Sequence, residues 1–476
     1  MRQASKLTLW VAAASMVVAP LVAWWPGRVW AEELDLERAV VRLRLLEPKG
    51  RMTRGEKKRH AAEIERVWAA VEAAGEEGVA RLKRELADAA KAKDKGHFFK
   101  LNGAALLWRL ARLHEANTIA GIWTATPLDS HYHDVFFTAL EAAKTQDPRA
   151  LPLLKACLPD DKGCATVPKQ YLTLRWPQTQ EVLWGAYGPK GLPELDGILE
   201  GAEDPAVVRF ALRHLTAAHY LGALGKIRWF IGSKNAAIRH LAIDCVGVFG
   251  HPDDYRLLVD GLRSDDPREL EHYARALADF GDVRAVEFLL PLLKSDDLDL
   301  RLQAIAALRT LLTRDGFEAL RERGARSRDA AERKVCWKTV AHVLGQIRLT
   351  WEDYAAKPDA ERTALIDGLR RRSQAALALP TGERTLTRDQ FLEAAKEWKK
   401  AGSTAGGKHG WVDGRHVAAV AKPGDVDLLL AVRAALYATL TDASLDQVAT
   451  LNTWIRRLGR SRYRRAPGIC DRVELK

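Results

Sequence analysis

Apolar residues recur through the middle of the chain at helical spacing, in blocks of 31 residues. The segment at 262–266 returns almost unchanged at 293–297. The fourth, eighth, twelfth and fifteenth positions of each block are mostly apolar, and spacings of four, four and three keep side chains on one face of a helix. The pattern therefore predicts an amphipathic helix in every block. The predicted block starts are Thr173, Asp204, Asn235, Asp266 and Asp297.

A second, shorter helix is expected in each block. Glycine follows the fifteenth position in three blocks, at Gly188, Gly250 and Gly281, where a helix C-terminus favours a residue that tolerates positive φ. A single helical hairpin cannot bury its own apolar side, so neighbouring hairpins must stack. The sequence predicts an all-α fold, an α-solenoid of helical hairpins. The second helices are expected at 192–199, 255–262, 283–293 and 317–323.

This pattern resembles the HEAT-repeat family. The resemblance rests on Asp266-Pro267, Ala276-Leu277 and Phe280-Gly281-Asp282, and it covers about 173–327. A looser hairpin at 131–158 and a degenerate repeat at 328–347 extend it. The resemblance implies a HEAT-like solenoid over 127–347, but it implies little about function, since such folds serve scaffolds, transport receptors and a few enzymes.

The N-terminus has the layout of a secretory signal peptide over residues 1–31. Arg2 and Lys6 precede an apolar stretch from Leu7 to Trp25, and small residues precede a cleavage point after Ala31. We expect a periplasmic or secreted protein cleaved near Ala31. Anchoring by an uncleaved N-terminal helix is the alternative.

The regions on either side of the repeats do not follow the 31-residue pattern. Residues 32–126 and 348–476 read as helical, the second with a Gly/Ser-rich loop near 401–410. Solenoids need atypical end units that cover their open apolar faces. Both regions are therefore expected to cap the solenoid.

The charge of the chain favours anionic partners. The formal charge is +12, and removal of Arg2, Lys6 and Arg28 with the signal segment leaves +9. A basic run near the C-terminus is a candidate for docking on an anionic surface, although a solvated helix end is the favoured explanation of such a run. The run includes Arg456, Arg457, Arg460, Arg464 and Arg465.

No catalytic or metal-binding motif emerges. Some HEAT-type proteins are di-iron enzymes, and that resemblance implies His-Glu pairs at equivalent helix positions of several repeats. His240 and His272 lie on first helices here, but the glutamate is missing beside the first and precedes the second. Nucleophile elbows, phosphate-binding glycine loops and paired zinc cysteines do not occur. We therefore expect no enzyme activity and no cofactor or metal. An enzyme site in the flanking helices is the less favoured alternative.

Two cysteines are disulfide candidates. Cys157 and Cys164 flank an evident turn region, and an oxidising compartment would favour their pairing. Cys245 and Cys336 lie almost three blocks apart, too far for the Cα separation of about 7 Å that a disulfide tolerates.

The second helices provide the expected binding surface for a protein partner. Their polar residues mix both signs of charge, which suits a folded protein or peptide better than a uniformly charged polymer. Trp229, on the same helix of the block at 204, is either an aromatic anchor or a core residue. We expect a non-catalytic scaffold or adaptor of the cell envelope, without nucleic acid; a tethered structural protein is the alternative. The candidate partner-binding residues are Arg256, Asp260, Arg263, Arg284, Glu287 and Lys294.

Overall fold

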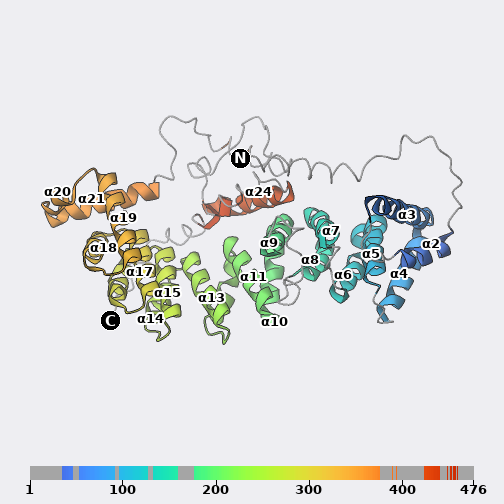
Figure 1. Ribbon diagram of the computed structural model, residues 1–476, viewed down its shortest axis with the longest axis horizontal. Coiled ribbons are helices and arrows are strands. Elements are labelled where there is room, and N and C mark those ends of the chain that lie inside the picture. Colours follow the sequence, from blue (N-terminus) through green and yellow to red (C-terminus); the bar gives the residue numbers. More distant parts are fainter. Residues whose placement is uncertain are drawn as a thin grey trace. The chain divides into compact units, whose positions relative to one another are not determined.

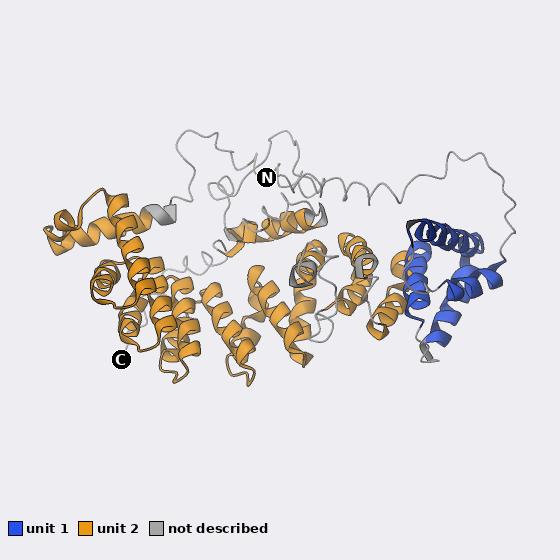
Figure 2. Ribbon diagram, viewed as in Figure 1, with its two compact units in different colours: residues 1–111 blue, residues 112–476 orange. Residues whose placement is uncertain are grey.

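The computed structural model describes residues 35–46, 53–91, 96–126, 132–158, 176–375 and 423–439, with isolated helical positions between 389 and 458. Every regular element in these residues is a helix. The chain divides into two compact units, residues 1–111 and 112–476 (Figure 2). Among the described helices, none combines the length and apolarity needed to span a bilayer. The predicted signal segment lies outside the described residues.

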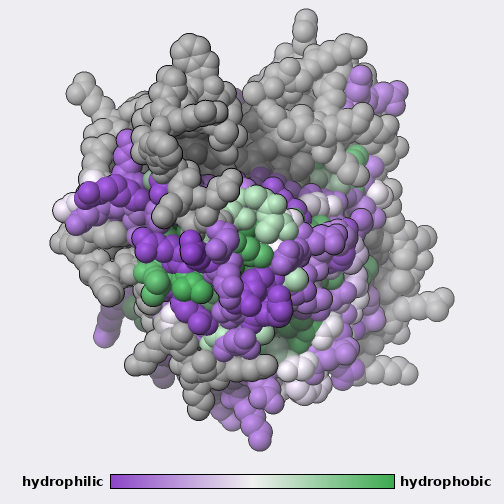
Figure 3. Space-filling model, turned by 90° about the vertical axis from the view of Figure 1, so that its right-hand side faces the viewer, coloured by the Kyte–Doolittle hydropathy of each residue, from purple (hydrophilic) through white to green (hydrophobic). Residues whose placement is uncertain are grey.

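In its described residues, the first unit is a small group of four helices with its own core. Thr53 and Glu56 form a reciprocal capping box at the start of α3, which satisfies backbone N–H groups at that helix end. The face drawn in Figure 3 shows mainly hydrophilic side chains with a few hydrophobic groups between them. The helices are α2 (Leu36–Leu45), α3 (Arg54–Ala73), α4 (Gly75–Lys91) and α5 (His97–Ala111).

The second unit holds the repeats (Figure 1). Its helices up to the end of the 204 block are α6 (Ala116–Ala125), α7 (Tyr132–Lys144), α8 (Leu151–Ala156), α9 (Trp176–Tyr187), α10 (Leu192–Gly201), α11 (Pro205–Ala217) and α12 (Leu224–Phe230). The next blocks contain α13 (Ala236–Phe249), α14 (Asp254–Gly261), α15 (Pro267–Phe280), η6 (Val283–Ala285), α16 (Val286–Leu289), η7 (Leu290–Lys294), α17 (Leu298–Leu311) and α18 (Arg314–Arg326). The last helices are α19 (Ala330–Ile347), α20 (Trp351–Ala355), α21 (Asp359–Ala375) and α24 (Val426–Thr439), and short 3-10 turns join several pairs.

The predicted block starts are helix N-caps. The side chains of Asp204, Asn235, Asp266 and Asp297 each accept a hydrogen bond from a backbone N–H of the first turn that follows. Asp329 caps α19 in the same way. Thr173 lies outside the described residues. The 31-residue period therefore has a local physical cause.

The sixteenth position, at the end of the first helix, adopts positive φ in all five predicted blocks. Gly188, Gly250 and Gly281 have φ of 83°, 61° and 80°, as the sequence predicted. His219 and Leu312 occupy the same position in the other two blocks, with φ of 51° and 43°. The turn is thus a property of the repeat, and two blocks adopt it without glycine and with the strain that an L-residue carries there.

The hairpins stack through their first helices. Helices α11, α13, α15 and α17 pack one on the next, and each second helix packs on the first helix of the following block, for example α14 on α15. The twelfth positions Val246, Leu277 and Leu308 are fully buried in this row. The all-α solenoid of stacked hairpins is confirmed.

One predicted second helix is interrupted. The segment predicted as a helix over 283–293 consists of η6, α16 and η7. Pro291 lies inside it, lacks a backbone N–H and cannot continue an α-helix. This irregular segment becomes part of the surface described below.

The C-terminal region covers the repeats at two places. Helices α20 and α21 pack on α18 and α19 through a core that contains Phe317, Val340, Tyr354 and Ile366. Helix α24 returns over more than 200 residues of sequence to pack on α9. The boundary between the compact units falls after Ala111, and α6 packs on α8 within the second unit.

Candidate protein-binding surface

The second helices α12, α14, α16, η7 and α18 form the surface on which the candidate residues were placed. Arg256 and Asp260 lie on α14, and Arg263 follows it. Asp260 lies between the two arginines, 3.5 Å from Arg256 Nε and 4.0 Å from Arg263 Nη1. Both arginines are more than three-quarters exposed. This cluster carries an excess positive charge that is accessible to a partner.

Hydrogen bonds within its own turn fix the side chain of Arg284. The carboxylate of Asp282 caps η6 and accepts bonds from Arg284 Nε and Nη2. The guanidinium also lies over the ring of Tyr255, 4.9 Å from its centroid. Asp147 and Arg149 repeat the same arrangement in an earlier hairpin. The guanidinium of Arg284 therefore stabilises the turn and forms a wall of the surface.

A groove of about 280 Å³ lies beside Arg284, between the second helices of two consecutive blocks. Of the six predicted binding residues, Arg284 and Glu287 line it, whereas Arg256, Asp260, Arg263 and Lys294 do not. The local pattern did not single out the other lining residues, which form one groove only when two consecutive blocks stack. These are Val283, Val286, Leu290, Thr313 and Asp315.

Apolar side chains are exposed along the same surface. Trp229 on α12 is 74% exposed, and Leu257 on α14 and Val283 on η6 are 37% and 39% exposed. Trp229 is therefore not a core residue. Exposed aromatic and aliphatic groups next to charged ones are typical of protein interfaces.

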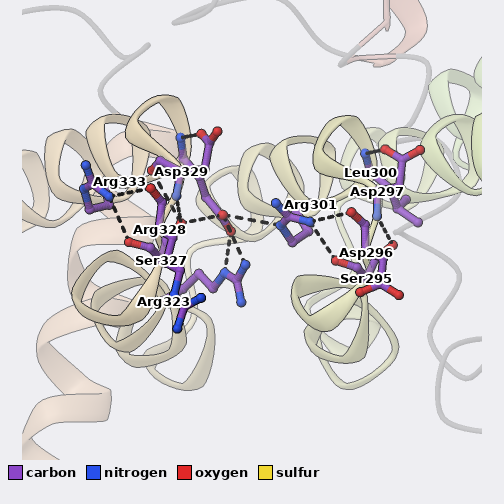
Figure 4. A network of polar contacts seen from close by, with 11 residues as sticks. Ser295, Asp296, Asp297, Leu300, Arg301, Arg323, Ser327, Arg328, Asp329 and Arg333 are labelled. Carbon is purple, nitrogen blue, oxygen red and sulfur yellow. Dashed lines mark hydrogen bonds and ion pairs between the residues drawn. The ribbon is translucent and has the colours of Figure 1, made fainter.

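The first helices present a different, closed arrangement of charge. Glu332 at the start of α19 is completely buried and accepts bonds from Ser327, Arg301 and Arg323 (Figure 4). Arg301 also donates to the backbone carbonyl of Ser295. We call this set, together with its counterpart below, the arginine–glutamate ladder. Its hydrogen bonds join α17, α18 and α19.

The counterpart of this set lies two blocks earlier. Glu269, on α15, accepts from Arg239 on α13 and from Ser264, and Arg239 donates to the carbonyl of Ser233. Glu269 stands at the fourth block position, where the other predicted blocks have apolar residues. The bond to Arg239 explains that exception.

Two histidines pack beside this counterpart. The rings of His240 and His272 stack with centroids 4.5 Å apart, and His272 Nδ1 lies 3.0 Å from the carboxylate of Asp244. The pKa of His240 is lowered by burial and by the neighbouring His272 and Arg239.

His240, Asp266 and Glu269 place one possible metal-ligand atom each within 4.8 Å of one another. Both oxygens of Glu269 are, however, already bonded to Arg239 and Ser264. A cation would have to displace the guanidinium, so the arrangement fits a structural ion pair better than a metal site.

A buried polar cluster lies where α24 covers α9 and α11. Arg433 is 4% exposed and donates to Asn452 Oδ1 at 2.7 Å and to the carbonyl of Ala217. Tyr437 donates to Glu181 at 2.8 Å. Burial, and secondarily Arg433, lower the pKa of His214 to about 3. The cluster fixes the C-terminal helix on the repeats.

The basic C-terminal run is only partly described. Arg456 is partly buried and donates to the carbonyl of Asn452, so it takes part in local packing. The side chains of Arg457, Arg460, Arg464 and Arg465 lie outside the described residues, and docking on an anionic surface stays a prediction.

The cysteines of the described residues are buried thiols. Burial raises the pKa of Cys157 and of Cys245 to about 12 and that of Cys336 to about 11. Cys164 lies outside the described residues, so its pairing with Cys157 stays a prediction.

No family model and no curated protein matches the chain. Among solved structures, the chain is similar to human deoxyhypusine hydroxylase in complex with glycerol, at 17% identity over 56% of this chain and 99% of that one, with a TM-score of 0.23. It is similar to an engineered protein at 16% identity over 88% and 99%, with a TM-score of 0.31. It is also similar to the CpcE–CpcF complex of phycocyanin lyase from Nostoc, at 18% identity over 52% and 94%, with a TM-score of 0.27. Similarity at this level says nothing about a reaction, cofactor or partner of this chain.

Proposed function

We propose that this chain is a non-catalytic scaffold of the HEAT type that binds a protein partner along its second helices. The observation that carries the proposal is the exposure of Trp229, which leaves a large aromatic side chain in water on a well-packed helix. Tryptophan is prominent among the residues that contribute most to protein interfaces. Leu257 and Val283 are exposed on the following blocks, so apolar anchors recur along the surface.

The charges on the first and second helices also favour the second helices as the binding surface. The ladder glutamates of the first helices are bonded within the fold, whereas Arg256 on α14 and Arg263 just after it share one carboxylate and remain exposed. Exposed charges at the rim of an interface govern partner selection and association rate.

We place the protein in the cell envelope, on the strength of the signal-like N-terminus. Sequencing the N-terminus of the mature protein tests this: a start at Glu32 supports export with cleavage, and a start at Met1 supports an uncleaved anchor.

A partner-capture experiment tests the binding function. The full mature chain is immobilised and exposed to an envelope extract, in parallel with Arg256→Glu/Arg263→Glu and with Lys338→Glu. Lys338 is exposed on α19, a first helix, and serves as the matched control. A captured protein is then purified, and its affinity for all three forms is measured.

The proposal expects the second-helix variant to bind at least about tenfold more weakly, because two charge contacts become repulsive, while the control binds as the wild type does. Equal affinity for all three forms would show that this surface is not the binding site.

A further inference from the structure

We propose that the groove beside Arg284 receives a lysine or arginine side chain of the protein partner, an inference that rests on the proposed function. The groove is formed by η6, α16 and η7 on one side and by the start of α18 on the other. Its lining combines an aliphatic floor with two carboxylates, and a long cationic side chain has the same two parts.

The floor suits an aliphatic stem. Val283, Val286 and Leu290 line the groove, and Val283 is 39% exposed. Lysine and arginine bury their methylene stems along apolar surfaces and keep their charged heads in water. Such a stem would cover apolar area that is now open.

Glu287 supplies an unused negative charge. It is exposed, and it has no ion-pair or hydrogen-bond partner in the described part of the chain. An exposed carboxylate at the edge of an apolar groove is available to a cation without breaking an existing bond.

Asp315 supplies the second negative charge. Its Oδ1 contacts Arg314, which also reaches Asp359 at 3.1 Å. Arg314 is therefore shared between two carboxylates. Asp315 is 63% exposed, and its Oδ2 accepts no bond from the described part of the chain. A partner cation can bind Asp315 while Arg314 keeps Asp359.

Arg284 does not cancel this negative charge. Its guanidinium donates two hydrogen bonds to the carboxylate of Asp282, which neutralises its charge, and the ring of Tyr255 covers one of its faces. The charges that remain open in the groove are thus Glu287 and Asp315.

The positive charge of the whole chain does not oppose this local preference. Charges more than about 8 Å away are largely screened at physiological ionic strength. A cationic group inside the groove therefore responds mainly to Glu287 and Asp315. A partner with an acidic side chain at this position would be repelled.

Methyl NMR of the full mature chain tests the inference with two small probes. N-acetyl-arginine methylamide carries the guanidinium, and N-acetyl-citrulline methylamide is its neutral isostere. The methyl signals of Val283, Val286 and Leu290 are followed during titration of each probe. The proteins are the wild type, Glu287→Gln/Asp315→Asn, and Glu322→Gln as a control that removes an exposed acid of α18 outside the groove.

The inference expects the arginine probe, and not the citrulline probe, to shift these methyl signals. It expects about fivefold or more weaker binding in the double variant and less than about twofold change in the control, the range for loss of exposed ion pairs. Equal responses to both probes, no response, or equal loss in the control would overturn it.

The result separates this inference from the proposed function. Binding of the arginine probe together with failure to capture any partner would support the groove chemistry and remove the proposed function. A captured partner whose affinity is the same for the double variant would remove the groove's role and leave the scaffold proposal standing.

Discussion

The ladder and the groove both contain carboxylates and arginines, but the ladder carboxylates are bonded within the fold and the groove carboxylates are exposed. At the ladder, Glu332 is completely buried, and Ser327, Arg301 and Arg323 bond to it (Figure 4). At the groove, two blocks earlier, Glu287 is exposed and carries no such bond within the described residues. A carboxylate whose oxygens are used within the fold contributes to architecture. A carboxylate left open beside apolar surface is available to a partner. Glu332→Ala and Trp229→Ala test the buried and the exposed side of this contrast, and two further variants test the packing beneath α24.

Loss of the ladder carboxylate should have the largest effect. Glu332→Ala leaves Arg301 and Arg323 without their shared partner, and removal of one member of a buried charge cluster costs about 4 kcal/mol. The free energy of unfolding in urea measures this. Glu322→Ala, an exposed substitution on α18, should change it by less than about 0.5 kcal/mol. Equal effects would show that the ladder does not stabilise the fold.

The ladder also predicts a pH dependence. Burial alone would raise the pKa of Glu332, but hydrogen bonds from Arg323 and Ser327 outweigh it, and the net pKa is lowered from 4.5. The stabilisation by ionised Glu332 is therefore present above about pH 4.5 and is lost as the pH falls through the lower pKa of the folded state.

The second-largest loss of stability is expected from a substitution in α9, where α24 packs on it. A Cβ at Gly185 would lie 2.1 Å from Cδ2 of Tyr437, so Gly185→Ala should force α24 from α9 and cost about 2 to 3 kcal/mol. In a Tyr437→Ala background the same change should be nearly neutral, because the clashing ring is gone. A double-mutant cycle with no coupling between the two positions would contradict the packing of α24 described above.

The buried histidine should give a smaller effect that depends on pH. Burial, followed by the charge of Arg433, lowers the pKa of His214 from 6.5 to about 3. Below pH 6.5 the unfolded chain binds a proton that the folded chain does not. The free energy of unfolding therefore decreases as the pH is lowered, by about 2 kcal/mol from pH 6.5 to about pH 5. His214→Gln should remove this slope from the urea unfolding curves. Replacing the exposed His342 should leave it unchanged.

The smallest stability effect is expected at the binding surface. Trp229→Ala should change the free energy of unfolding by less than about 0.5 kcal/mol, because the indole is 74% exposed. The same variant should weaken partner binding by more than about 2 kcal/mol if Trp229 is a central anchor. A large loss of stability without loss of binding would reverse the roles assigned here.

Local features of the fold could be predicted from the sequence, and long-range ones could not. The caps at Asp204 and Asp266 and the positive φ at Gly250 depend on a few neighbouring residues, so the 31-residue pattern reveals them. The packing of α24 on α9 joins Glu181 to Tyr437, 256 residues apart, and no local pattern encodes that pairing.

The binding surface was likewise predicted only where its features are local to one block. Arg284 and Glu287 were selected because they lie on a second helix, but Asp315 belongs to the next block and joins them only when the blocks stack. Glu269 was a visible exception in the apolar pattern, and that exception was the available signal for the ladder. Whether Trp229 was an anchor or a core residue could not be decided without the packing of α12.

Site-specific photo-crosslinking tests the central claim most directly. A photoreactive phenylalanine replaces Trp229 on a second helix or Trp337 on a first helix; both are exposed, at 74% and 43%. The account predicts that the captured partner crosslinks from position 229 and not from position 337. Crosslinking from position 337 alone would contradict it and would place the partner on the first helices.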